Sequence, residues 1–139
     1  MRLNGVRGTY LLTWGIGYFG VGLSYIIAPT PGRQAAFSWL PIWDEPDKWG
    51  WIWLVAAVVA ITTAFRHGSE AVNHADRWGF AALSVAPLAW TMIYGVASFL
   101  IHEVSPLATV FIYAPMTIGQ YAASRMENSH ATVRGDPNA

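Results

Sequence analysis

The sequence predicts an all-α fold, namely an integral membrane four-helix bundle with a short interfacial helix in the first outer loop. The chain has 139 residues, of which 54% are hydrophobic and 12% are charged, whereas about 25% are charged in a typical soluble domain. Four stretches contain no Asp, Glu, Lys, Arg or His. Each is close to the roughly 20 helical residues that cross a hydrocarbon core about 30 Å thick. The charges therefore segregate as in a membrane protein.

The four predicted spans cover residues 9–28, 49–65, 78–101 and 104–124. The first follows Arg2 and Arg7, as the apolar part of a signal peptide would. Its apolar run is longer than the roughly 7–15 residues of a signal core, and no small-x-small cleavage site precedes Pro29. We therefore expect it to be a retained anchor.

The segment between the first two spans is the longest outer loop. Thr30-Pro31 is a plausible helix start and Pro41 a stop, so a short helix lying in the outer interface fits this segment. A re-entrant plug, or an exposed patch that meets a partner, is the alternative interpretation. Tryptophans crowd the same level, which is typical of an interfacial aromatic belt. We assign to this belt Trp39, Trp43, Trp49 and Trp53.

The third and fourth spans are separated only by His102 and Glu103, which predicts a tight helical hairpin. Pro87 lies inside the third span and Pro115 inside the fourth. Each proline removes a backbone donor and is expected to kink its helix, which a bundle tolerates where a neighbour satisfies the freed carbonyl.

The distribution of basic residues predicts the orientation. The N-terminus, the loop 66–77 and the tail share one side, which carries Arg2, Arg7, Arg66, Arg77, Arg125 and Arg134. The other side has only Arg33 and Lys48. This asymmetry places both termini in the cytoplasm, so we expect a multi-pass protein of the cytoplasmic membrane. Residues 125–139 are polar, and we expect a disordered cytoplasmic tail.

Small residues recur along every predicted span and indicate helix contacts, because they allow two backbones to approach closely in lipid. Such stripes could close one bundle or also mediate self-association. The predicted helix-packing residues are Gly15, Gly22, Ala56, Ala60, Ala64, Ala82, Ala86, Gly119 and Ala123.

No pattern indicates an enzyme or a cofactor. His67, Glu70 and His74 would share one face of a helix, but this spacing matches no zinc motif, and surface histidines are the favoured interpretation. The spans lack the histidines that bind haem between helices and the carboxylates of proton-coupled transporters. The chain has no cysteine and a net charge of zero, which excludes thiol chemistry and gives no footprint for nucleic-acid binding.

Three strings resemble small four-pass membrane proteins encoded by actinobacterial phages: the opening 7–12 (RGTYLL), the loop 36–41 (AFSWLP) and the start of the second span, 49–53 (WGWIW). The resemblance covers most of the chain, and some of these proteins are suspected holins. It implies a protein that oligomerises in the host cytoplasmic membrane and permeabilises it at lysis. The chain departs from common holins in having four spans and no strongly basic tail.

We therefore expect a non-enzymatic membrane protein, specifically a phage holin or lysis accessory. Its partners would be the lipid bilayer and either further copies or another membrane protein. The alternative is a membrane-resident interaction or exclusion protein that acts through its Trp-rich, acidic outer loop. A further alternative is a small channel or transporter lined by the hydroxyl groups of the spans.

Overall fold

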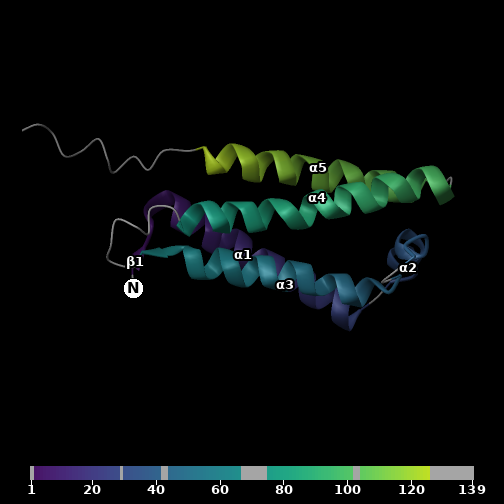
Figure 1. The fold of residues 1–139 in the computed structure, drawn as a ribbon, viewed down its shortest axis with the longest axis horizontal. Helices are drawn as coiled ribbons and strands as arrows, with labels where there is room; N and C mark the ends of the chain where they lie inside the picture. The colour runs from purple at the N-terminus through teal and green to yellow at the C-terminus, as the bar shows by residue number, and fades with distance from the viewer. Residues whose placement is uncertain (1, 29, 42–43, 67–74, 102–103, 126–139) are drawn as a thin grey trace, which may run out of the picture.

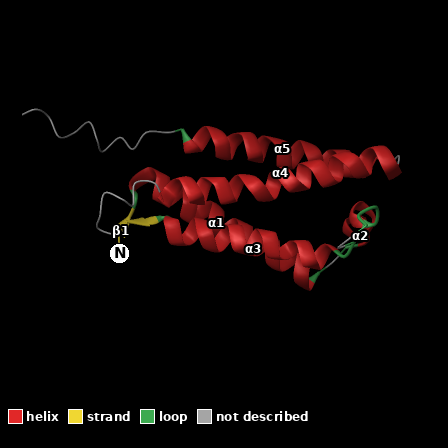
Figure 2. Cartoon of the chain, viewed as in Figure 1, coloured by secondary structure: helices red, strands yellow, loops and turns green. Residues whose placement is uncertain are grey.

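The computed structural model describes residues 2–28, 30–41, 44–66, 75–101 and 104–125. The fold is all-α, as the sequence predicts (Figure 2). Its helices are α1 (Gly5–Ile27), α2 (Pro31–Phe37), α3 (Pro46–Thr63), α4 (Ala75–Ile101) and α5 (Val104–Ser124). The short helix α2 begins as expected, with Pro31 in its first turn and the Thr30 side chain accepting a hydrogen bond from the Arg33 backbone N–H.

One short strand pairing was not predicted. Strand β1 (Arg2–Leu3) pairs antiparallel with β2 (Phe65–Arg66), so that Leu3 lies opposite Phe65. The Asn4 backbone N–H extends the pairing by donating to the Ala64 carbonyl at 2.9 Å. Two residues are too few to produce a strand periodicity in a sequence. The pairing fixes the start of α1 beside the end of α3.

The four long helices run side by side (Figure 1). Helices α1 and α3 pack closely along their lengths, α4 packs on α3, and α5 packs on α4 at the edge of the bundle. Helix α2 lies at one end of this assembly. The start of α1 and the end of α5 meet at the other end, where the Arg7 side chain hydrogen-bonds the Ser124 carbonyl at 3.0 Å.

Two of the described helices, α1 and α4, are long and apolar enough to cross a membrane. Only 28% of the apolar stretch of α1 and 44% of that of α4 are buried inside the protein. A core helix of a water-soluble protein would be mostly enclosed, so these two helices favour membrane association. By length and composition, two of the described helices could cross a membrane, whereas the sequence predicts four spans.

The centre of the bundle is filled by aromatic side chains. Trp53, Trp90, Tyr18, Tyr25 and Phe37 are among the largest fully buried side chains. Their rings meet mostly edge to face, an arrangement that adds about 0.5–1.5 kcal/mol per pair beyond the burial of area. Aromatic side chains therefore fill the centre of the bundle.

The structure differs from two predictions about the outer end of the bundle, one on the tryptophan belt and one on helix α2. Trp53 is fully buried and contacts Tyr18 and Trp90 at ring-centroid distances of 4.6 and 5.2 Å, so it is a core residue and not part of an interfacial belt. Trp39 and Trp49 are half-buried against the core, and Trp43 lies outside the described residues. Helix α2 also buries Phe37 completely, so it closes the end of the bundle instead of only lying on the interface.

The predicted packing glycines of α1 face α3. A Cβ added at Gly22 would lie 2.8 Å from the Leu54 Cδ2, and one added at Gly15 would lie 2.7 Å from the Ile61 Cγ1. Gly50 of α3 meets Gly22 from the other side, where an added Cβ would lie 2.9 Å from the Gly22 carbonyl oxygen. These contacts leave no room for a side chain at the crossing.

The alanines predicted to pack are enclosed in most cases, with Ala82 half-buried and Ala56, Ala60, Ala64, Ala86 and Ala123 buried. Gly119 differs, because a Cβ there would meet nothing within 4 Å and the residue is exposed. Its face of α5 points away from α4.

Pro87 shows how the bundle accommodates a proline inside a helix. Proline has no N–H, so the carbonyl of Leu83, four residues earlier in α4, loses its helical donor. The Tyr18 hydroxyl of α1 donates to this Leu83 oxygen at 2.7 Å. A neighbouring helix thus satisfies the freed carbonyl, as expected.

Candidate functional site: a polar pocket beneath α2

Arg33 places a guanidinium at the end of the bundle where α1 finishes. Its Nη1 donates to the Ser24 carbonyl at 2.8 Å, and its Nη2 donates to the Ser24 hydroxyl at 3.1 Å. The guanidinium carbon lies 3.9 Å from the centroid of the Tyr25 ring. A cation that binds the last carbonyls of a helix is favoured by the helix dipole, and stacking on Tyr25 fixes its direction.

Three tyrosines gather next to Arg33, one from each of α1, α4 and α5. The Tyr25 and Tyr94 hydroxyl oxygens are 3.2 Å apart and hydrogen-bonded. The rings of Tyr94 and Tyr113 lie 6.3 Å apart between centroids. Phenol groups come together in this way because each ring fills the core while its hydroxyl reaches a polar partner.

These side chains line a pocket of about 340 Å³ below α2. Arg33, Tyr25, Tyr94 and Tyr113 supply polar groups to its wall, and Thr109 of α5 adds a hydroxyl. N–H and O–H donors converging on one small space suit a small anionic or carbonyl-bearing group. The described part of the pocket wall contains no histidine, carboxylate or thiol.

A second polar cluster joins the helices at the opposite end. Arg7 Nε donates to Asp76 Oδ2 at 2.7 Å, with side chains only 12% and 6% exposed. The Arg7 guanidinium also lies 4.9 Å from the centroid of the Phe80 ring. Together with the bond to Ser124, these contacts connect α1, α4 and α5, so this pair holds the end of the bundle together.

The first turn of α3 has an exposed ion pair. Lys48 Nζ and Glu45 Oε2 are 2.9 Å apart, and both side chains face solvent. The hydrogen bond to Glu45 raises the pKa of the Lys48 ammonium above its ordinary value, and the charges of Glu45, Asp44 and Asp47 act in the same direction. An exposed pair of this kind contributes little to stability.

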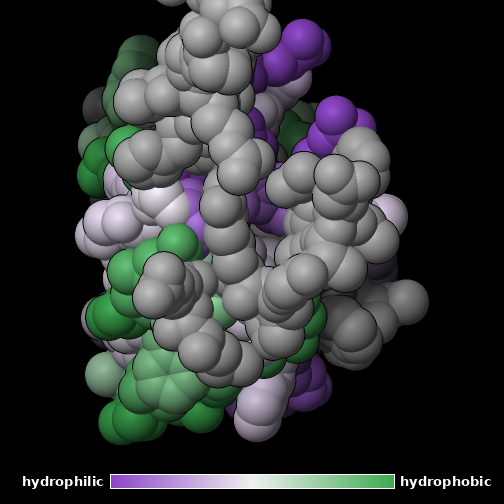
Figure 3. All heavy atoms as spheres, turned by 90° about the vertical axis from the view of Figure 1, so that its left-hand side faces the viewer, coloured by the Kyte–Doolittle hydropathy of each residue, from purple (hydrophilic) through white to green (hydrophobic). Residues whose placement is uncertain are grey.

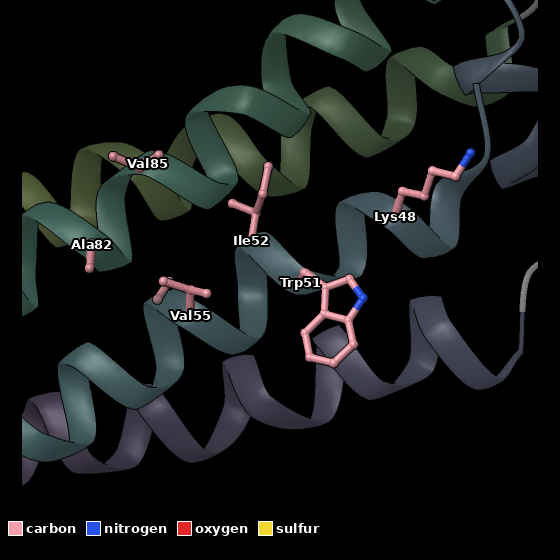
Figure 4. Close-up of a pocket in the computed structure, with 7 residues that line it drawn as sticks. Lys48, Trp51, Ile52, Val55, Ala82 and Val85 are labelled. Carbon is pink, nitrogen blue, oxygen red and sulfur yellow. The ribbon is translucent and has the colours of Figure 1, made fainter. Parts of the chain in front are cut away.

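Lys48 stands at the end of an apolar groove between α3 and α4 (Figure 4). The groove has a volume of about 600 Å³. Its walls are Trp51, Ile52 and Val55 from α3 and Ala82 and Val85 from α4. Apart from the Lys48 ammonium, the side chains that line this groove are apolar.

The candidate metal ligands His67, Glu70 and His74 lie outside the described residues, as do His102 and Glu103. Within the described ranges, no group of three or more His, Asp or Glu residues could hold a metal ion. The interpretation of His67 and His74 as surface histidines therefore stays a prediction.

The sequence analysis did not predict the pocket formed by Arg33 and the three tyrosines. The sequence gives only a weak signal, which is that Tyr25 lies on a regularly spaced face of α1. Tyr18 and Tyr25 are seven residues apart with Leu11 seven before, so all three share one face of α1, and all are buried. Gln120 of α5 is also fully buried, which no pattern in the sequence indicates. No protein-family model, curated protein or solved structure matches this chain.

Proposed function

We propose that this chain is a four-span integral membrane protein of the cytoplasmic membrane, with both termini in the cytoplasm. The carrying observation is that large apolar side chains remain exposed along all four long helices although the core is already filled. Contiguous apolar surface of this extent calls for a lipid or protein cover. Examples from each helix are Ile16, Phe19, Val55, Val58, Leu88, Met92, Phe111 and Ile118.

The dimensions of the other two helices support four spans. Helix α5 has 21 residues and α3 has 18, within the roughly 17–25 that cross a bilayer. The charges of α3, Asp47 and Lys48, stand in its first turn, where an interface would be. Reporter fusions at both termini test this arrangement, and reporters on opposite faces would overturn it.

For the activity, we propose a holin or lysis accessory whose copies associate through the outward face of α5. This helix packs mainly on α4, and its exposed residues include a row at helical spacing that contains two alanines and a glycine: Ala108, Ile112, Pro115, Gly119 and Ala122. Small residues on an uncovered face allow a second helix to approach. Because the core of one copy is filled, any lesion has to form between copies.

Controlled expression in a bacterium tests this activity. We expect growth to stop and the membrane potential to collapse abruptly once the protein accumulates. Gly119→Leu, on the open face of α5, should delay the collapse, whereas Gly20→Leu, at an equally open glycine of α1, should not. Normal growth at high membrane accumulation would contradict the proposal.

The second candidate is a membrane-resident interaction or exclusion protein that binds its partner at the α2 end. The observation that favours it is the Arg33 pocket, with Asp44 and Glu45 exposed nearby in sequence. Deleting the loop would also remove the buried Phe37, so a point change is the sharper test. Arg33→Gln should abolish the activity of an interaction protein and leave that of a pore-former nearly intact.

The channel or transporter alternative loses support. Most hydroxyl groups of the spans donate to carbonyls of their own helix, as Thr62, Ser84 and Ser98 do at 2.8–3.0 Å. A hydroxyl used in this way has no proton left to donate to a solute and offers it only acceptor lone pairs.

A further inference from the structure

A groove opens between the start of α4 and the end of α5, at the end of the bundle opposite the tyrosine pocket. Its volume is about 510 Å³. Arg77 comes to it from the first turns of α4, and Arg125 comes from just after α5. Ala81 and the ring of Tyr121 form the exposed apolar surface of the groove, and Phe80, which is only 2% exposed, lies beneath it. The groove thus combines two cations with an apolar surface, which is the complement of an anionic amphiphile.

The positive charge of this groove is not cancelled by its nearest described carboxylate. Asp76 is 6% exposed and its Oδ2 already accepts a hydrogen bond from Arg7. Among the described residues, neither Arg77 nor Arg125 forms an ion pair with an acidic side chain. Figure 3 looks onto this end of the molecule and shows hydrophilic residues next to strongly apolar ones.

Arg125 is held at the groove by Tyr121. Its Nη2 donates to the Tyr121 hydroxyl at 2.7 Å, and its guanidinium carbon lies 5.2 Å from the centroid of the Tyr121 ring. A guanidinium has five N–H donors, so this bond leaves most of them for a ligand. Their planar arrangement matches two oxygens of a phosphate group.

We propose that this groove binds the phosphate of an anionic glycerophospholipid from the inner leaflet, with an acyl chain along Ala81 and Tyr121. The inference rests on the membrane placement proposed above. Basic pockets between membrane helices on the cytoplasmic side bind anionic headgroups in this way. The apolar surface and the exposed Tyr121 favour a lipid over a soluble phosphate. Apolar contacts would stabilise the acyl chain of a lipid, whereas a free phosphate ion has no apolar part to make them.

Lipid retention by the purified full chain in a neutral detergent tests the proposal. Phosphatidylglycerol or phosphatidylcholine with the same acyl chains is added, and bound lipid is counted by native mass spectrometry. We expect preferential retention of phosphatidylglycerol. Arg77→Gln and Arg125→Gln should each weaken it about fivefold, the effect of removing one cation near a membrane surface. Lys48→Gln, which removes an exposed cation at the opposite end, should leave it unchanged.

The other outcomes distinguish a failure of the lipid-binding groove from a failure of the proposed membrane placement. Equal retention of both lipids by a protein that requires detergent, or equal loss in Lys48→Gln, overturns the groove while leaving the membrane placement intact. Displacement of the lipid by millimolar glycerol phosphate shows a site for free phosphate and also overturns it. A chain that stays dissolved without detergent and retains no lipid contradicts the membrane placement itself.

Discussion

The α1–α3 contact and the α4–α5 contact join helices of similar length by different means. Between α1 and α3, Gly15 and Gly22 bring the two backbones together, and an added Cβ would clash. Between α4 and α5 the contact is made by side chains such as Tyr94 and Tyr113, and a Cβ at Gly95 would find only ordinary contact with Val110 at 4.0 Å.

The difference shows that a small residue marks a close crossing only where its face is covered. Gly22 and Gly119 both occur in small-residue stripes of the sequence. In the structure Gly22 lies against α3, whereas Gly119 faces outward with open space around it. Substitutions that add volume should therefore destabilise the α1–α3 contact. Substitutions that remove volume should destabilise the contacts made by large side chains, such as the one between α4 and α5.

The largest effect should come from Trp53→Ala, because the Trp53 side chain touches helices that take part in both the α1–α3 and the α4–α5 contact. Trp53 of α3 touches Tyr18 of α1, Trp90 of α4 and Tyr113 of α5. Losing a buried tryptophan costs about 3–5 kcal/mol, because a cavity is left behind. Unfolding in mixed detergent micelles measures this cost. Trp51→Ala, at the exposed neighbour two residues earlier, is the control and should change little.

Gly22→Leu should come next, because it adds volume at the closest crossing. Its Cβ would lie 2.8 Å from Leu54 and 3.0 Å from the Gly50 carbonyl oxygen. Overpacking of this kind costs about 1–3 kcal/mol. The same unfolding measurement applies, together with cross-linking between α1 and α3. Equal effects of Gly22→Leu and of Gly20→Leu, where space is open, would show that the α1–α3 crossing is not tight.

Tyr18→Phe should cost about 1 kcal/mol, the size of a hydrogen bond between membrane helices. The change removes the donor to the Leu83 carbonyl but keeps the ring. A double-mutant cycle with Pro87→Ala sharpens the test, because the second substitution restores a helical N–H to that carbonyl. Tyr18→Phe should then cost less. The same cost in both backgrounds would mean that the hydroxyl does not compensate for the proline.

Glu45→Gln should have the smallest effect, since its pair with Lys48 is exposed. The pKa of Lys48 should fall toward its ordinary value when the hydrogen bond to the carboxylate is lost. In the native protein the raised pKa means that the pair contributes at pH values below the ordinary lysine pKa and is lost as the pH rises through the raised value. Titration of Lys48 by NMR measures the shift, and an unchanged pKa would contradict the contact.

The outer loop and the aromatic residues show the limit of sequence reasoning. Thr30 and Pro31 identified the start of α2 because capping depends on neighbouring residues. Trp53 looked like an interfacial residue, since its position near the start of a span is the same whether it faces lipid or the core. Only the packing of α1, α4 and α5 around α3 enclosed it.

By itself the sequence determined the all-α class, the approximate helix ranges and the segregation of charge, because these follow from composition and from local backbone preferences. The tertiary structure alone decided that Arg33 meets Tyr25, that Arg7 pairs with Asp76 sixty-nine positions away, and that Gly22 is covered while Gly119 is open. The physical reason is that the rotation of each helix about its axis, and hence the neighbour of each face, depends on how all the helices pack together.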